Sequence, residues 1–107
     1  MNSYSRRWVE GVQYQGVDEK IPYNLDTSNQ PGTTRTSLQV KAYQYTPPNT
    51  YTDVTSTIIS GTPAASGTDI GFVVHALTAG VLYRIETKWT NEDGGVFEAW
   101  GEIQAER

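Results

Sequence analysis

The chain has 107 residues, a formal net charge of −4 at pH 7, one histidine and no cysteine. This length suits one small domain, and the lack of cysteine favours intracellular synthesis, because small secreted domains often carry a disulfide. The mild negative charge argues against a nucleic-acid surface. No apolar run is long enough to cross a membrane or to form a signal peptide, so we expect neither.

Abundant Thr, Ser, Gly and Pro, without a long helical pattern, predict an all-β protein with many turns. Residues 1–7 are expected to form a flexible N-terminal arm, followed by a single domain over residues 8–107. In that domain, residues 8–14 have a weak strand pattern that Gly11 interrupts, which indicates an edge strand or a bulge. Residues 20–25 alternate and predict a second strand.

The middle of the chain reads as strands separated by turns. Residues 26–34 are predicted to be a loop, and residues 35–45 a third strand. The β-branched residues 53–59 predict a short fourth strand, and the small residues 61–67 predict a mobile loop. Residues 69–75 are expected to form the fifth strand.

The last quarter of the chain predicts a hairpin. Its first arm, residues 82–90, alternates strictly, a Gly-ended polar turn follows, and the second arm covers residues 96–104. Opposite charges across strands fix the register, because a shift by two residues sets glutamates against each other. That register pairs Thr90 with Val96, Lys88 with Glu98, Arg84 with Glu102, Trp89 with Phe97 and Tyr83 with Ile103.

The turn before this hairpin carries a recognisable spacing. Leu77, Gly80 and Tyr83 follow the form Leu-x-x-Gly-x-x-Tyr. A tyrosine near the start of the sixth strand of a Greek-key sandwich hydrogen-bonds back to the backbone a few residues upstream, which is the tyrosine corner. We therefore predict that Tyr83 makes this bond, that Gly80 allows the tight crossing and that Leu77 plugs the core.

Seven short strands separated by turns fit an immunoglobulin-like sandwich of two antiparallel sheets with Greek-key topology. A small β-barrel is the alternative.

Catalysis is not expected from these residues. The single histidine, His75, excludes an imidazole-based triad or a multi-histidine metal site within one chain. Glu98 and Glu102 share a strand face and suggest a glycosidase pair, but the hairpin register assigns them to basic partners. The acidic tip at residues 91–93 has too few oxygens for Ca²⁺. We predict no catalytic residue, no metal and no cofactor.

Exposed aromatic residues suggest an interface instead. Tyr43 and Trp100 are predicted to face solvent between polar neighbours, and such residues are enriched at protein interfaces. Near the N-terminus, Arg6 and Arg7 precede Trp8, which gives an anchor of the kind found at binding hot spots. These five residues are the predicted interface.

Several short segments resemble small immunoglobulin-like, fibronectin type III-like structural proteins of tailed bacteriophages. The resemblance covers about half of the chain, at residues 53–55, 60–63, 77–80, 83–85 and 98–100. The first half departs from fibronectin type III domains, whose second strand carries a core tryptophan.

The resemblance implies a virion protein that is made in the host cytoplasm, an adaptor or decoration protein. Its partners would be capsid, connector or tail proteins, and it would itself form a symmetric homo-oligomer that binds by multivalent docking. It would bind neither nucleic acid nor a membrane. The alternative is a carbohydrate-binding sandwich that uses Trp100 and Tyr43 as stacking platforms.

Overall fold

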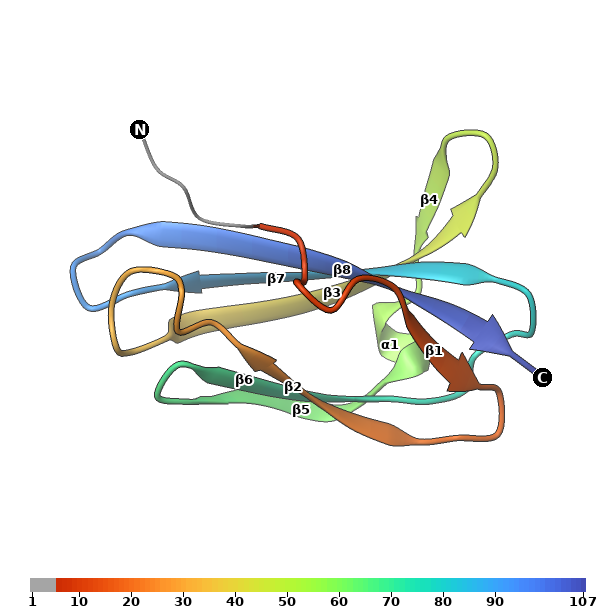
Figure 1. Ribbon diagram of the computed structural model, residues 1–107, viewed down its shortest axis with the longest axis horizontal. Coiled ribbons are helices and arrows are strands. Elements are labelled where there is room, and N and C mark those ends of the chain that lie inside the picture. The colour runs from red at the N-terminus through yellow and green to blue at the C-terminus, as the bar shows by residue number, and fades with distance from the viewer. Residues whose placement is uncertain (1–5) are drawn as a thin grey trace.

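In the computed structural model, which describes residues 6–107, two β-sheets pack face to face (Figure 1). The larger sheet has the strand order β1-β8-β7-β3-β4, and the smaller sheet has the order β2-β6-β5. The elements are β1 (Gln13–Gly16), β2 (Ile21–Asp26), β3 (Thr36–Thr46), β4 (Thr50–Asp53), α1 (Thr55–Ile58), β5 (Ile59–Ser66), β6 (Asp69–Val74), β7 (Leu82–Thr90) and β8 (Val96–Glu106).

The all-β sandwich is confirmed, but the count of seven strands is wrong, because the described chain forms eight. The strand predicted at residues 53–59 is instead the end of β4, the helix α1 and the start of β5. The Asp53 carboxylate accepts bonds from the Thr55 N–H and hydroxyl, at 2.9 and 2.7 Å, and this turn overrides the β propensity of the segment.

The prediction of a loop at residues 61–67 is also wrong, because most of this segment belongs to β5. It forms a strand despite its small residues because β6 provides a partner, with Ala65 opposite Ile70. Gly67, at φ +60°, takes the left-handed conformation at the turn between them. Tertiary pairing here outweighs local propensity.

The prediction of a purely antiparallel sandwich needs a second correction. β1 pairs with β8 in parallel, with Gln13 opposite Ile103. After β1 the chain crosses to β2 in the smaller sheet. It later returns to the larger sheet, where the last strand, β8, runs beside β1 (Figure 1). The other strand pairs are antiparallel.

The predicted hairpin of β7 and β8 is confirmed, including its register. Thr90 lies opposite Val96, and the remaining pairs follow without a bulge. Tyr83, Ile85, Thr87 and Trp89 are buried on the inner face, as the alternation predicts. β7 and β8 therefore supply much of the core between the sheets.

Tyr83 ties the turn before β7 to the core. Its hydroxyl accepts a hydrogen bond of 2.8 Å from the backbone N–H of Thr78, which is the contact of a tyrosine corner. Gly80 takes a φ of +80°, in the left-handed region that favours glycine. Leu77 is buried in the core cluster. The bond of Tyr83 and the burial of Leu77 thus hold the segment that crosses from β6 of the smaller sheet to β7 of the larger sheet.

Replacing Tyr83 by Phe should destabilise the fold by about 1 kcal/mol without changing its shape, because the N–H of Thr78 loses its partner at a site that water reaches in part. Tyr14→Phe is the control, since the side chain of Tyr14 is exposed. Urea unfolding measures both variants. An unfolding midpoint for Tyr83→Phe equal to that of the wild type would remove the corner bond from the list of stabilising contacts.

The tip of the β7–β8 hairpin holds the loop between β2 and β3. The Glu92 carboxylate accepts hydrogen bonds from the backbone N–H groups of Thr33 and Thr34, at 2.9 and 3.2 Å, and from the Thr33 hydroxyl. Bonds from its own backbone N–H and from those two residues lower the pKa of Glu92 to about 2. Gly32 lies so close that a Cβ there would meet the Glu92 carboxylate.

Beneath this contact lies a buried arginine that the sequence did not reveal. Arg35 donates to the hydroxyl and the carbonyl of Thr27, at 2.8 and 3.0 Å, and to the carbonyls of Pro31 and Thr34. Its guanidinium lies 5.4 Å from the ring centroid of Trp89. Burial lowers the pKa of Arg35. The segment predicted as a plain loop is therefore organised around one cation.

Stability should fall as the pH decreases from about 4.5 to about 2, and Glu92 should contribute to that fall. Its pKa is lower in the folded state than in the unfolded chain, so its contribution is complete above pH 4.5 and is lost as the carboxylate protonates. Glu92→Gln should remove this contribution, and Glu106→Gln, at the other end of β8, is the control. Thermal unfolding across this pH range measures it. Parallel curves for wild type and Glu92→Gln would contradict the role of Glu92.

Candidate functional site

The outer face of the larger sheet gathers four of the five predicted interface residues. Trp100 lies on β8, and Arg7 forms a parallel bridge with it. Tyr43 lies on β3 opposite Arg84 of β7, and Arg84 in turn lies opposite Glu102 of β8. Directly opposed residues share a sheet face, so Tyr43 and Trp100 belong to one surface. We call it the outer face, and its residues are Arg6, Arg7, Tyr43, Arg84, Glu86, Glu98, Trp100 and Glu102.

Trp100 is the centre of this face. The guanidinium of Arg84 lies 4.2 Å from its ring centroid, and that of Arg7 lies 5.1 Å away. Each contact is a cation–π interaction, worth about 0.5–1 kcal/mol at an exposed site. Arg84 also donates to Glu86 at 2.7 Å. The ring is therefore half-buried among charged side chains of both signs.

The ion pairs on the outer face differ from those predicted. Glu98 pairs with Arg6 at 3.4 Å and Glu102 pairs with Arg7 at 2.9 Å, whereas the sequence assigned them to Lys88 and Arg84. The cause is the N-terminal segment, which lies along β8 and brings two arginines to it. Because the pairs are largely exposed, each contributes about 0–1 kcal/mol.

The same contacts correct the predicted N-terminal arm. The backbone of residues 6–8 is hydrogen-bonded to β8, with Trp100 N–H donating to the Arg6 carbonyl and Trp8 N–H to the Trp100 carbonyl, at 2.6 and 2.8 Å. Residues 6 and 7 thus belong to the edge of the sheet and not to a free arm. The prediction for residues 1–5 lies outside the described residues.

Trp8 is the member of the predicted interface that the structure removes from the surface. Its side chain is 7% exposed and belongs to the core cluster. Its ring lies near those of Tyr23 and Phe72, with centroids 6.4 and 6.1 Å apart. An anchor buried in its own domain cannot dock to another protein, so Trp8 is a core residue.

Gly101 was the signal for this burial. It stands on the inner face of β8, where the neighbouring inward residues are Ala99 and Ile103. A Cβ at this position would overlap the indole of Trp8. A glycine on the inner face of a central strand indicates a close approach by another group, and here that group is Trp8.

Trp8→Ala should destabilise the protein by about 3–5 kcal/mol, because it leaves a large cavity in the core. Val9→Ala is the matched control, since the neighbouring side chain is 78% exposed. Chemical denaturation measures both. A loss below about 1 kcal/mol for Trp8→Ala would show that the tryptophan does not hold the fold together.

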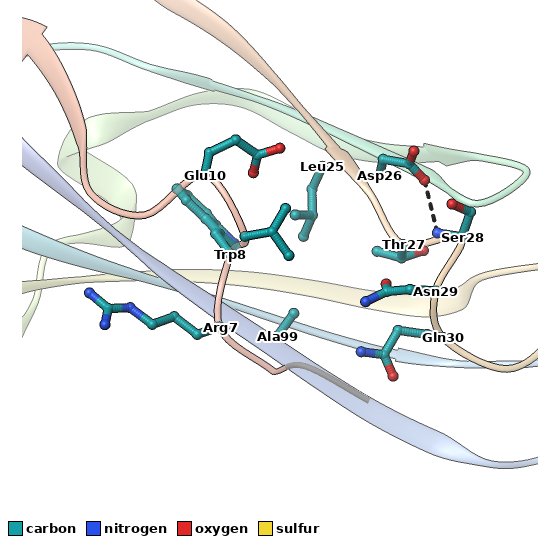
Figure 2. Close-up of a pocket in the computed structure, with 11 residues that line it drawn as sticks. Arg7, Trp8, Glu10, Leu25, Asp26, Thr27, Ser28, Asn29, Gln30 and Ala99 are labelled. Atoms are coloured by element: carbon teal, nitrogen blue, oxygen red, sulfur yellow. Dashed lines mark hydrogen bonds between the residues drawn. The ribbon is translucent and has the colours of Figure 1, made fainter. Parts of the chain in front are cut away.

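A cleft opens beside Trp8, between the N-terminal segment and β2. Its volume is about 230 Å³, and a second hollow of about 200 Å³ lies on the Tyr23 side of Trp8. Figure 2 shows Trp8 and Leu25 at one end of the cleft and Asn29 and Gln30 at the other. Arg7 points away from it (Figure 2). No pattern in the sequence predicted this opening.

Within residues 6–107, no group of three His, Asp or Glu side chains is placed to hold a metal ion. His75 follows β6, and its N–H donates to the Ile58 carbonyl at 2.9 Å. In the same residues, no helix is long and apolar enough to span a membrane.

Among solved structures, murine CRIg, which is an immunoglobulin-like domain, is similar to this chain. The TM-score is 0.56 at 12% sequence identity, and the match covers 90% of this chain and 91% of that of CRIg. The likeness shows an immunoglobulin-like fold. No family model matches the chain, and no curated protein matches its sequence.

Proposed function

We propose that this chain is a non-enzymatic docking domain, and that it serves as an adaptor or decoration protein of a bacteriophage virion. The observation that carries the docking role is the outer face, where Arg6, Arg7, Tyr43 and Trp100 lie on one side of the larger sheet. Half-exposed aromatic residues with arginines beside them are the composition of interface centres.

The charges of this face suit a protein partner. Arginines and glutamates surround Trp100, and their mutual pairs range from exposed, for Arg6 and Glu98, to partly buried, for Arg84 and Glu86. A partner can exchange these weak pairs for its own at small cost, since exposed ion pairs contribute about 0–1 kcal/mol each. Complementary charges then set the orientation of docking more than its strength.

One copy of such a face binds weakly, and a symmetric array binds firmly. We therefore propose that the chain works as a homo-oligomer whose copies dock together onto capsid, connector or tail proteins. The virion and the synthesis in the host cytoplasm rest on the resemblance of residues 53–55, 60–63, 77–80, 83–85 and 98–100 to phage structural proteins. The Greek-key topology rests on the pattern of short strands and on the spacing of the tyrosine corner. Neither nucleic acid nor a membrane is part of this proposal.

A carbohydrate-binding module is the second candidate. It would need the ring of Trp100 as a flat platform, with Tyr43 beside it. Two guanidinium groups already lie over that ring, at 4.2 and 5.1 Å. A sugar would have to displace them, which favours protein docking over sugar binding.

The double variant Tyr43→Ala, Trp100→Ala tests the docking role. We expect the wild type to sediment as an oligomer and to be incorporated into particles, and the variant to be lost from particles with its circular dichroism spectrum and its oligomeric state unchanged. Val73→Ala is the control, because Val73 lies on β6 of the other sheet, between buried neighbours that face the core. Mass spectrometry of particles purified from the source culture tests the virion assignment, and the chain should be present in them.

A wild type that stays monomeric at high concentration and is absent from particles would contradict the proposal. Retention of that monomer on a polysaccharide column, lost in Trp100→Ala, would establish the carbohydrate alternative instead.

A further inference from the structure

The outer edge of β2 is open in the described residues. β2 is the terminal strand of the smaller sheet, and its ladder partner is β6. The N-terminal segment passes nearby but hydrogen-bonds to β8. An edge strand that is neither paired nor covered offers its backbone groups to another chain.

The hydrogen-bond pattern identifies the backbone groups that face this edge. Thr27 N–H donates to the Thr68 carbonyl at 2.9 Å, and this pair continues the regular register of β2 with β6. Antiparallel pairs alternate between bonded and non-bonded positions, so Tyr23 and Leu25 face β6, whereas Asn24 and Asp26 face outward. Pro22 agrees with this pattern, because a residue without an N–H belongs on the outward side.

The cleft and the hollow beside Trp8 run along this edge. Leu25 lines both of them, and Tyr23 and Phe72 provide an apolar floor in the hollow. The Nε1–H of Trp8 is buried and has no hydrogen-bond partner, although the indole lines both spaces. An unsatisfied buried donor costs about 1–3 kcal/mol, and other atoms of the same indole border the open spaces.

The rim of the cleft is acidic. Glu10 and Asp26 both line it (Figure 2). Hydrogen bonds from Ser28 lower the pKa of Asp26. An occupant with basic residues beside its apolar ones complements these charges.

We propose that the outer edge of β2 binds an extended segment of a partner protein by β-strand addition, and that this segment alternates apolar and basic residues. Its backbone pairs with the outward groups of Asn24 and Asp26, as in other strand-addition complexes. An apolar side chain enters the hollow against Tyr23 and Leu25. The basic side chains lie near Glu10.

This edge is separate from the outer face, so the inference goes beyond the proposed function. β2, which would receive the partner segment, is on the smaller sheet, whereas Tyr43 and Trp100 are on the larger one. Loss of docking at one surface leaves the other unchanged, and the two proposals fail independently.

The test uses the full chain and an acetylated, amidated peptide of sequence Lys-Val-Lys-Val-Lys-Val as the probe. Hydrogen exchange of the free protein should be fast at the amides of Asn24 and Asp26 and slow at Tyr23 and Leu25. The peptide should slow exchange at Asn24 and Asp26. A control peptide with the same side chains and methylated backbone nitrogens should not.

Two substitutions at Asn24 separate backbone pairing from side-chain contact. Asn24→Pro removes an N–H that β6 does not use, and it should weaken peptide binding about tenfold. Asn24→Ala keeps the N–H and should bind as the wild type does.

Each contrary outcome overturns the inference. Slow exchange at Asn24 and Asp26 in the free protein would mean that the edge is already filled. Equal affinity of Asn24→Pro and Asn24→Ala would mean that the backbone is not the binding group. If Asn24→Pro does not fold, the exchange data on the wild type decide alone. In that case, amide exchange at Asn24 and Asp26 that the peptide does not slow would overturn the proposal.

Discussion

The contact between Trp8 and Gly101 is the constraint on which the sandwich depends. The indole lies where a side chain on β8 would otherwise stand, and it packs with Tyr23 and Phe72 of the smaller sheet. One residue thereby joins the N-terminal segment, β8 and the smaller sheet. Because the domain has no cysteine, no disulfide connects the two sheets, and aromatic packing takes over that role. A buried tryptophan can contribute several kcal/mol in this way.

This contact also determines what the surface presents. With Trp8 buried, the backbone of residues 6–8 is held against β8, and Arg6 and Arg7 project onto the outer face. They neutralise Glu98 and Glu102 and lie beside Trp100. The outer face therefore depends on a core residue, and a variant that loosens Trp8 would alter it without touching it. Deleting residues 1–8 would for the same reason confuse loss of docking with loss of the fold.

The sequence predicted best where the pattern was local and redundant. The alternation of residues 82–90 and the charges opposite them fixed the β7–β8 hairpin and its register. It failed where a specific contact outweighed the local propensity of the segment. β5 forms from small residues because β6 pairs with it, and α1 forms because Asp53 binds Thr55. The same holds for the candidate site. Alternation along the strands predicts that Trp100 and Tyr43 lie on the outer face, whereas the positions of Arg7 and Trp8 follow only from the folded structure.

Two buried indole nitrogens lack partners in residues 6–107, and their surroundings give them different meanings. Trp89 is fully buried, with Arg35 over its ring, so its N–H pays a cost that the aromatic packing and the cation offset. Trp8 lies against open spaces that reach solvent. Elsewhere in residues 6–107 the buried side-chain polar atoms have partners, as Gln15 has in the Val74 carbonyl and the Tyr23 hydroxyl. The spaces beside Trp8 also border the unpaired edge of β2, so a strand docked there would cover the part of the core that is open to solvent.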